Sequence, residues 1–317
     1  MSRLSNNAEN ALNETRMLIL GAQVLIGFDF QAGFQPAFDR LSPATQELKL
    51  VGLGLMLLAV GLLIAPGAFH QIVEAGNDTP RLMDFTGRIA SLALLPFALG
   101  IGLELSIATQ VVIGDDHLGT LAAVLGTLFA LFFWYGLHWL WRVRDQRLGI
   151  AREAHNMPEP TPLETRIKQV LTEARVVLPG AQALLGFQLA AMLTDAFGRL
   201  PRTSQYVHLA SLILMAAAIV FLMAPAAFHR IVEQGQDSER LHRFSSAMVL
   251  AALVPLGLGI SGDFYVVAEK VLNSSAAGIG LAIASLIFFF GLWFGLTLVL
   301  RARGEPARSL RVSRAAR

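Results

Sequence analysis

The chain has 317 residues, of which 54% are hydrophobic and only 15% are charged. Soluble domains carry about 25% charged residues, so most of this surface is not built to face water. The formal net charge of +2 gives no indication of a nucleic-acid partner, and the absence of cysteine excludes disulfides, thiolate metal sites and thiol nucleophiles.

Eight apolar runs are each long enough to cross a bilayer, since about 20 helical residues span its ~30 Å hydrocarbon core. Helices are favoured over barrel strands, which would be shorter and would alternate in polarity. The first run follows a polar stretch and recurs later in the chain, so we interpret it as part of the fold rather than as a signal peptide. The predicted spans are 17–38, 48–69, 89–113 and 118–141, then 176–197, 207–228, 248–272 and 276–300.

The second half of the chain repeats the first half at a fixed offset. Gly21-Ala22-Gln23 returns as Gly180-Ala181-Gln182, and the run that ends at His70 returns at His229, where 229 − 70 = 159. A constant offset indicates internal duplication. Four spans in each half place both halves in the same orientation, so the sequence predicts an all-α integral membrane protein with eight transmembrane helices in two parallel four-helix repeats. We place the repeats at 1–142 and 163–301, with a Pro-containing linker at 143–162 and a basic tail at 302–317.

The distribution of Lys and Arg predicts the orientation in the membrane. The linker and the C-terminal tail are rich in Arg, whereas the loop at 114–117 contains neither Lys nor Arg. Positive charge accumulates on the cytoplasmic side of membrane proteins. We therefore expect both termini in the cytoplasm and the protein in the bacterial inner membrane.

A short amphipathic pattern precedes the first span of each half. In the second half its apolar residues lie on one face of a helix, and the equivalent positions of the first half are in phase but weaker. The pattern predicts short interfacial helices on the cytoplasmic side, with a polar linker of accidental spacing as the alternative. The residues are Leu163, Ile167, Val170 and Leu171, and Leu4, Ala8, Ala11 and Leu12.

Two carboxylic acids at equivalent positions are the strongest candidates for function. Glu104 and Asp263 lie inside apolar spans, slightly outside the middle. An ionised acid at the centre of a membrane helix costs about 2.5–3.5 kcal/mol, so such residues usually serve a purpose. An acid in this position can exchange a proton or hold a monovalent cation. The alternative is a structural acid that is hydrogen-bonded to a neighbouring helix.

Prolines and small residues surround both acids. Corresponding Gly- and Pro-interrupted spans in two halves are a pointer to a transporter site, although both residue types are common in membrane helices. We therefore treat these positions as candidate helix breaks. They are Pro96, Gly100, Gly102, Pro255, Gly259 and Gly262.

Other polar residues in or near the spans are secondary candidates. Gln23 and Gln182 form a matched pair that is suited to bonds between helices or to substrate contact, and Asp29 is a further acid of the first half. A cytoplasmic proton relay is one interpretation of the histidines that end spans 2 and 6 and of the acids four residues later. A bis-histidine haem site and simple helix-end capping are the alternatives. These four residues are His70, Glu74, His229 and Glu233.

The run Pro179-Gly180-Ala181-Gln182, the end of span 6 at His229 and the acid of the next span carry a resemblance to a known family. They resemble a group of small bacterial membrane proteins that are classified as a domain of unknown function, usually as one four-span unit. The resemblance covers both halves, and some members carry an automatic sodium:proton antiporter label. It implies the fold more than the activity. Gln71 in place of Arg230, and Glu104 in place of Asp263, are departures between the halves.

The sequence therefore predicts a multi-pass membrane protein that moves protons or monovalent cations, with a non-transport structural or accessory subunit as the main alternative. Haem-based electron transfer through the two histidines is a third hypothesis. No enzyme motif, metal-ligand spacing or cofactor motif stands out, and the lipid bilayer is the expected partner. The pattern leaves substrate, direction and oligomeric state open, a homo-oligomer included.

Overall fold

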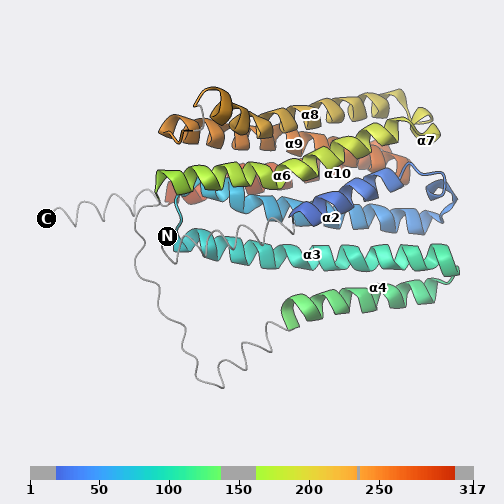
Figure 1. The fold of residues 1–317 in the computed structure, drawn as a ribbon. Coiled ribbons are helices and arrows are strands. Elements are labelled where there is room, and N and C mark those ends of the chain that lie inside the picture. Colours follow the sequence, from blue (N-terminus) through green and yellow to red (C-terminus); the bar gives the residue numbers. More distant parts are fainter. Residues whose placement is uncertain (1–18, 137–161, 234–235, 304–317) are drawn as a thin grey trace, which may run out of the picture.

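Polar caps at the ends of apolar runs set the helix boundaries in a computed structural model of the chain, which describes residues 19–136, 162–233 and 236–303. Ser42 caps α2, Thr79 caps α3, Asp115 caps α4, Ser238 caps α9 and Ser274 caps α10, each through a side-chain oxygen that accepts backbone N–H groups. The long helices are α2 (Pro43–Ile72), α3 (Pro80–Ile113), α4 (Asp116–Leu131), α6 (Leu163–Met192), α8 (Arg202–Ile231), α9 (Glu239–Leu272) and α10 (Ser275–Phe290) (Figure 1).

Shorter elements complete the described part of the chain, which contains no strand. A helix at Ile19–Ala32 precedes α2, and single turns form η1 (Phe38–Arg40) and α7 (Asp195–Gly198). Segments of π-helix, η2 (Phe132–Gly136) and η3 (Gly291–Leu296), extend α4 and α10.

The duplication is visible in the helices themselves. α2 and α8 have 30 residues each, α3 and α9 have 34, and α4 and α10 have 16. Their starts differ by the same number of residues, because 202 − 43 = 239 − 80 = 275 − 116 = 159. The two halves therefore use the same secondary structure, residue for residue, from α2 onwards.

The helices are long and apolar. Seven of the described helices are long and apolar enough to cross a membrane, and Ile19–Ala32 is a shorter apolar helix. Exposed apolar side chains follow α3 from Leu92 to Ile113, which at ~1.5 Å per residue is about 32 Å and matches a ~30 Å hydrocarbon core. A similar band follows α10 and its extension from Ile279 to Val299. These features indicate a membrane protein.

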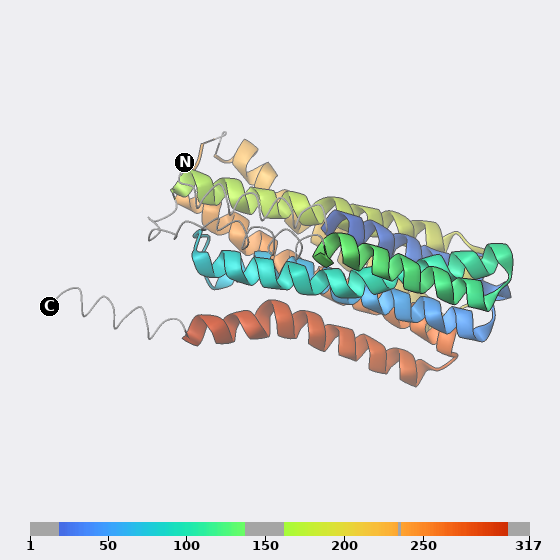
Figure 2. The same cartoon turned by 90° about the horizontal axis from the view of Figure 1, so that it is seen from below.

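The two ends of the bundle are defined by contacts between the halves. At one end, which we call the α7 end, Lys270 donates a hydrogen bond to Asp39 at 2.6 Å and Arg199 pairs with Asp39 at 3.3 Å. At the opposite Asp78 end, Gln169 of α6 donates to the Asp78 carboxylate at 2.7 and 2.8 Å. α6 runs from the Asp78 end to the α7 end, and the helix at 19–32 runs in the same direction from the middle of the bundle (Figures 1 and 2).

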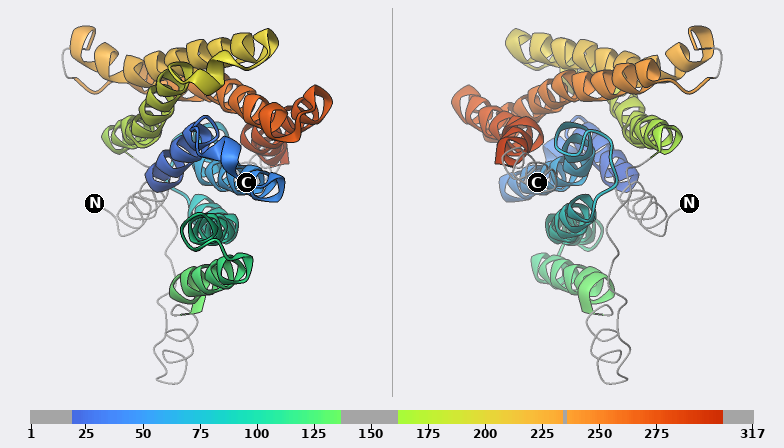
Figure 3. Two further views of the ribbon diagram at one scale, coloured as in Figure 1. Left: turned by 90° about the vertical axis from the view of Figure 1, so that its right-hand side faces the viewer. Right: turned by 90° about the vertical axis from the view of Figure 1, so that its left-hand side faces the viewer.

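The two halves pack side by side, but equivalent helices do not occupy equivalent environments. α8 and α9 lie on one side of the molecule, α2, α6 and α10 lie in the middle, and α3 and then α4 lie on the far side (Figures 1 and 3). In the most apolar stretch of α2, 67% is buried, against 28% in the equivalent stretch of α8. α2 is therefore the central helix, because the second half covers a face that its counterpart leaves bare.

Three features differ from the sequence-based predictions. The predicted interfacial helix at Leu163–Leu171 is not separate: it is the first part of α6, where Ile167 and Val170 are buried and Gln169 contacts Asp78 of the first half. Its equivalent at residues 4–12 lies outside the described residues. The first helix ends at Ala32 rather than at Phe38, because a series of turns follows it up to η1. α3 and α9 begin nine residues before their predicted spans, at caps that hydropathy does not detect.

Candidate functional site

A buried ion triad joins three helices of the first half. The Lys49 ammonium of α2 donates to Asp29 Oδ1 of the first helix at 2.8 Å and to Glu104 Oε2 of α3. The Asp29 and Lys49 side chains are 5% and 10% exposed, and that of Glu104 is 29% exposed. With both acids ionised the triad carries one net negative charge, so one proton or monovalent cation would neutralise it.

Two carboxylate oxygens of this triad make no hydrogen bond to the described residues. Asp29 Oδ2 and Glu104 Oε1 are buried, and neither has a hydrogen-bond partner among the described residues. A buried acceptor without a partner is costly, since it keeps its desolvation penalty with no compensating bond. The first triad therefore offers two free carboxylate oxygens to a proton or a small cation.

A second triad occupies the equivalent place in the second half. Asp263 of α9 accepts a hydrogen bond from Gln188 Nε2 of α6, and its Oδ1 lies 3.2 Å from His208 Nδ1 of α8. His208 Nε2 lies 3.0 Å from the Gln188 carbonyl oxygen, to which it must donate. The Nδ1–Oδ1 contact then needs one further proton, carried by either the imidazole or the carboxyl group. This triad is therefore built to hold a single proton.

Aromatic rings close the second triad from the other half of the chain. Phe30 stacks on His208 with ring centroids 5.5 Å apart, and Phe34 lies at 6.4 Å. A cavity of about 10 Å³, barely the space that one water molecule needs, lies beside Asp263 between the halves. The site around Asp263 is thus nearly dry and is composed of residues from both repeats.

The two triads are one ancestral arrangement with different residues. Asp29 is equivalent to Gln188, Lys49 to His208 and Glu104 to Asp263, each at an offset of 159. Sequence reasoning identified both acids and Asp29 but missed both basic residues. Lys49 and His208 are the second residues of their predicted spans, where a basic side chain at the membrane surface is ordinary. Their matched positions in the repeat were the signal that could have revealed them.

The triads lie within the apolar band rather than at its edge. Glu104 is nine residues from Ile113, so about 14 Å from the α7 end of the band and about 18 Å from Leu92. Lys49 lies six residues, about 9 Å, inside the start of α2. Glu104 therefore lies within the exposed apolar band of α3 and not at its edge.

The prolines and glycines around the acids do not break the helices. α3 continues through Pro96 and α9 through Pro255 for 34 residues each. The glycines instead allow close packing: a Cβ on Gly102 would lie 2.7 Å from the Ala123 carbonyl oxygen, and one on Gly262 would lie 2.2 Å from Ser211 Oγ. Gly100 faces Met56 and Gly259 faces the Ser211 backbone in the same way. These residues hold α2, α3 and α4, and likewise α8 and α9, close enough to form the triads.

Comparison with known proteins supports the duplication. A family of unknown function, DUF6328, matches the chain twice, at residues 1–138 and 160–297. The chain belongs to this family. The second DUF6328 match begins 160 − 1 = 159 residues after the first, so the predicted tandem duplication of an uncharacterised family unit is confirmed. No curated protein and no solved structure matches the chain.

The matched glutamines of the two DUF6328 units have different environments. Gln23 is fully buried, and it lies over Gly180 of α6, where a Cβ would be only 1.6 Å from Gln23 Oε1. Gln182 is exposed. Gln23 is therefore part of the contact between the halves, whereas its counterpart has no equivalent contact in the described chain.

The relay candidates of the first unit form a buried cluster between the halves. His70 Nδ1 contacts Glu173 of α6, and Gln71 donates to the same carboxylate at 2.6 Å. α2 ends at Ile72, so Glu74 lies in the following turn, where its side chain is buried. His70 thus pairs with an acid of the other repeat instead of the acid four residues later. The structure favours docking of α6 as the role of this cluster.

The equivalent residues of the second unit are more open. His229 is 30% exposed and its Nε2 lies 3.8 Å from Asp237 Oδ1, beyond hydrogen-bond range, and Glu233 is partly exposed. His70 and His229 therefore have different partners and different burial. The arrangement gives no geometric support to a haem site between them.

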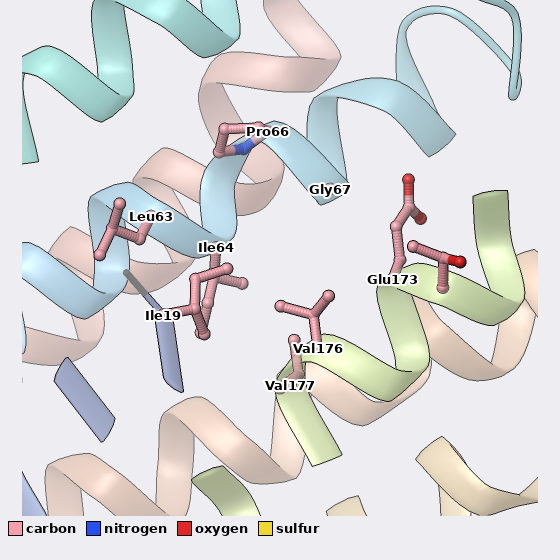
Figure 4. Close-up of a pocket in the computed structure, with 9 residues that line it drawn as sticks. Ile19, Leu63, Ile64, Pro66, Gly67, Glu173, Val176 and Val177 are labelled. Carbon is pink, nitrogen blue, oxygen red and sulfur yellow. The ribbon is translucent and has the colours of Figure 1, made fainter. Parts of the chain in front are cut away.

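A small cavity lies beside the His70–Glu173 contact. It measures about 40 Å³ and is lined mainly by apolar side chains of the first helix, α2 and α6, with Glu173 at its rim (Figure 4). Apolar cavities of this size stay dry, so it offers no polar ligand site. Within the described ranges, no group of three or more His, Asp or Glu side chains could hold a metal ion.

Proposed function

We propose that this chain is an eight-span protein of the bacterial inner membrane that exchanges protons or monovalent cations at its two buried triads. The supporting observation is that each repeat unit places a carboxylic acid and a basic side chain in contact inside the apolar band. Charged residues inside membrane spans are rare, and they mark ion pathways and proton relays more often than chance. The two repeats lie parallel, with both termini in the cytoplasm.

The chemistry of the first triad suits competition between cations. The Lys49 ammonium neutralises one of the two acids, and the free oxygens of Asp29 and Glu104 leave room for one more positive charge. A proton or a monovalent cation that binds these oxygens competes with the ammonium for the carboxylates. The site therefore has two states that differ by one unit of charge: a net charge of −1 without the added cation and none with it.

The second triad suits a proton alone. The imidazole of His208 and the carboxyl group of Asp263 share one proton, and Gln188 fixes both partners. The near-dry surroundings leave little space for a hydrated cation. The two repeats then have different roles, a cation-binding site in the first and a proton-holding site in the second.

A structural role is the competing proposal, and a specific observation favours it. Both triads link three helices, and the cavity at Asp263 is too small to form a water-filled path. A non-transport subunit would use such bonds to fix helix packing. It predicts that amide substitutions lower stability and have no effect on any ionic flux.

Proteoliposomes that contain the purified chain and an internal pH dye separate the two proposals. We expect an imposed sodium or potassium gradient to change the internal pH with wild-type protein. E104Q/D263N is expected to abolish this flux while retaining a folded protein in detergent. The matched control is D116N, because Asp116 is an exposed acid at the first turn of α4 outside the triads. A wild-type flux that persists in E104Q/D263N would refute the role of the acids, and no flux in any preparation would refute transport.

A further inference from the structure

One face of α2 packs against the second half within the chain, and we call this contact the mated interface. Gly54 lies against Phe264 of α9, whose ring tip would be 3.6 Å from an added Cβ. Gly61 lies against Phe288 and Phe289 of α10, and its carbonyl oxygen accepts a hydrogen bond from Trp293 Nε1 at 2.8 Å. This interface joins the first repeat to the second.

Because of the duplication, each of the two faces that form the mated interface has an equivalent elsewhere in the chain. Both equivalents, which we call the bare faces, are exposed. On α8 the equivalents of Gly54 and Gly61 are Ile213 and Val220, which are 59% and 64% exposed. On α3 and α4 the equivalents of Phe264 and Phe288 are Leu105 and Phe129, which are 44% and 66% exposed. In the chain these two faces lie on opposite sides of the molecule (Figures 1 and 3).

Burial along the helices shows the same asymmetry. Ile64 and Ile72 of α2 are 3% and 8% exposed, whereas their equivalents Met223 and Ile231 of α8 are 50% and 75% exposed. Gln23 lies over Gly180, but no described atom lies within 4 Å of a Cβ built on Gly21, the equivalent of Gly180. The contact between the repeats is therefore heterologous: it joins two different faces, and the second copy of each face, in the other repeat, has no partner within the chain.

The bare faces carry bulky apolar side chains at the positions equivalent to the mated interface. Where the mated interface sets Gly61 against Phe288, the bare faces have Val220 and Phe129, so one more bulky apolar residue is present on the bare side. The mated interface sets the small Gly54 against the large Phe264. At the equivalent positions the bare faces have Ile213 and Leu105, two side chains of medium size. Trp134, the equivalent of Trp293, is present on the bare side too. Lipid alone would require only that these residues be apolar.

The first triad is incomplete in a single chain. Phe30 and Phe34 cover His208 from the other repeat, and their equivalents on and just after α6 are Leu189 and Leu193, which are 50% and 89% exposed. In the first triad, Glu104 is more open than its equivalent in the second: its side chain is 29% exposed, against 8% for Asp263. The missing cover for the first triad is thus present in the chain, but it faces outwards.

We propose that a second copy of this chain packs head to tail on the first, with its α8 against α3 and α4, and with the C-terminal end of its α6 over the Glu104 triad. This interface repeats between chains the contact that joins the two halves within a chain. The Glu104 site is then composed of residues from two molecules, as the Asp263 site is composed of residues from two repeats. The proposal does not depend on what the triads transport.

Cysteine cross-linking in membrane vesicles tests this arrangement directly, because the natural chain has no cysteine. V220C and F129C are placed in two differently tagged copies that are co-expressed and treated with a short bis-maleimide. We expect a two-chain product that carries both tags only from this mixture. V220C alone and F129C alone are expected to give none, because a head-to-tail contact brings unlike faces together. I213C with L105C is a second, independent pair.

The matched control pairs V220C with I287C, since Ile287 of α10 is 69% exposed but lies outside the proposed interface. This mixture is expected to give no product. Self-linking of V220C would overturn the head-to-tail geometry in favour of a two-fold contact. Absence of product from both mixed pairs, or an intramolecular link in the V220C/F129C double variant, would overturn the proposal.

Discussion

Removal of the central charge of the first triad gives the most informative stability prediction. K49M leaves the buried Asp29 and the partly buried Glu104 without their shared cation, while the side chain keeps most of its apolar length. Removal of one partner from a buried ion pair costs roughly 3–5 kcal/mol. Because both acids can take up protons in response, we expect a loss near the lower end, about 3 kcal/mol, in the free energy of unfolding.

The repeat supplies a matched control for K49M. The triple variant D29Q/K49H/E104D gives the first triad the residue types of the second, which the three equivalent helices of the other half already accommodate. We expect it to unfold within about 1 kcal/mol of wild type, as a replaced and still bonded network should. Unfolding in mixed detergent micelles, followed by circular dichroism, measures both. A K49M protein as stable as wild type would refute the claim that Lys49 is a buried ion-pair partner.

Two further changes test the packing between the repeats. G61A places a Cβ 2.3–2.8 Å from the rings of Phe288 and Phe289, so we expect it to lower the free energy of unfolding by about 1–3 kcal/mol. G67A is the control: its Cβ meets nothing within 4 Å, so the change should be neutral or slightly stabilising. Thermal unfolding compares the two variants, and equal midpoints would contradict the close approach at Gly61. E173A removes the acceptor of His70 and Gln71 at the interface and should cost about 2–4 kcal/mol, against less than about 0.5 for E164A on the exposed side of the same helix. Limited proteolysis of the linker region should detect the loosened α6 of E173A, and unchanged resistance would contradict its docking role.

Much of the fold could be predicted because it depends on local patterns. Apolar length predicted the long apolar helices, and the constant offset of 159 residues predicted the duplication. Helix ends were less accurate, since α3 and α9 begin directly after their caps Thr79 and Ser238, whose capping bonds have no hydropathy signal. The continuation of α6 through residues 163–175 was missed because its buried face contacts the other half, which a single helix pattern cannot show.

The candidate site could be predicted only in part, for a related reason. An acid inside an apolar span is conspicuous, so Glu104 and Asp263 were found from the sequence. Lys49 and His208 were not, because a basic residue near a predicted span end is normally at the surface. Their role depends on how far α2 and α8 extend beyond the apolar run. α2 begins at the Ser42 cap, and α8 begins directly after Pro201, which makes no side-chain capping bond. The unequal burial of matched residues, such as Gln23 and Gln182, depends on how the two repeats pack.

The most direct test of the central claim is whether the triad carboxyl groups exchange protons with water. Infrared difference spectra of the reconstituted protein, recorded across a pH step and again in D₂O, report the protonated carboxyl groups. We predict carboxyl bands that respond to pH, shift in D₂O, and disappear selectively in E104Q and in D263N. Bands assigned by these variants that neither respond to pH nor exchange with D₂O would contradict the account and leave the triads as structural links.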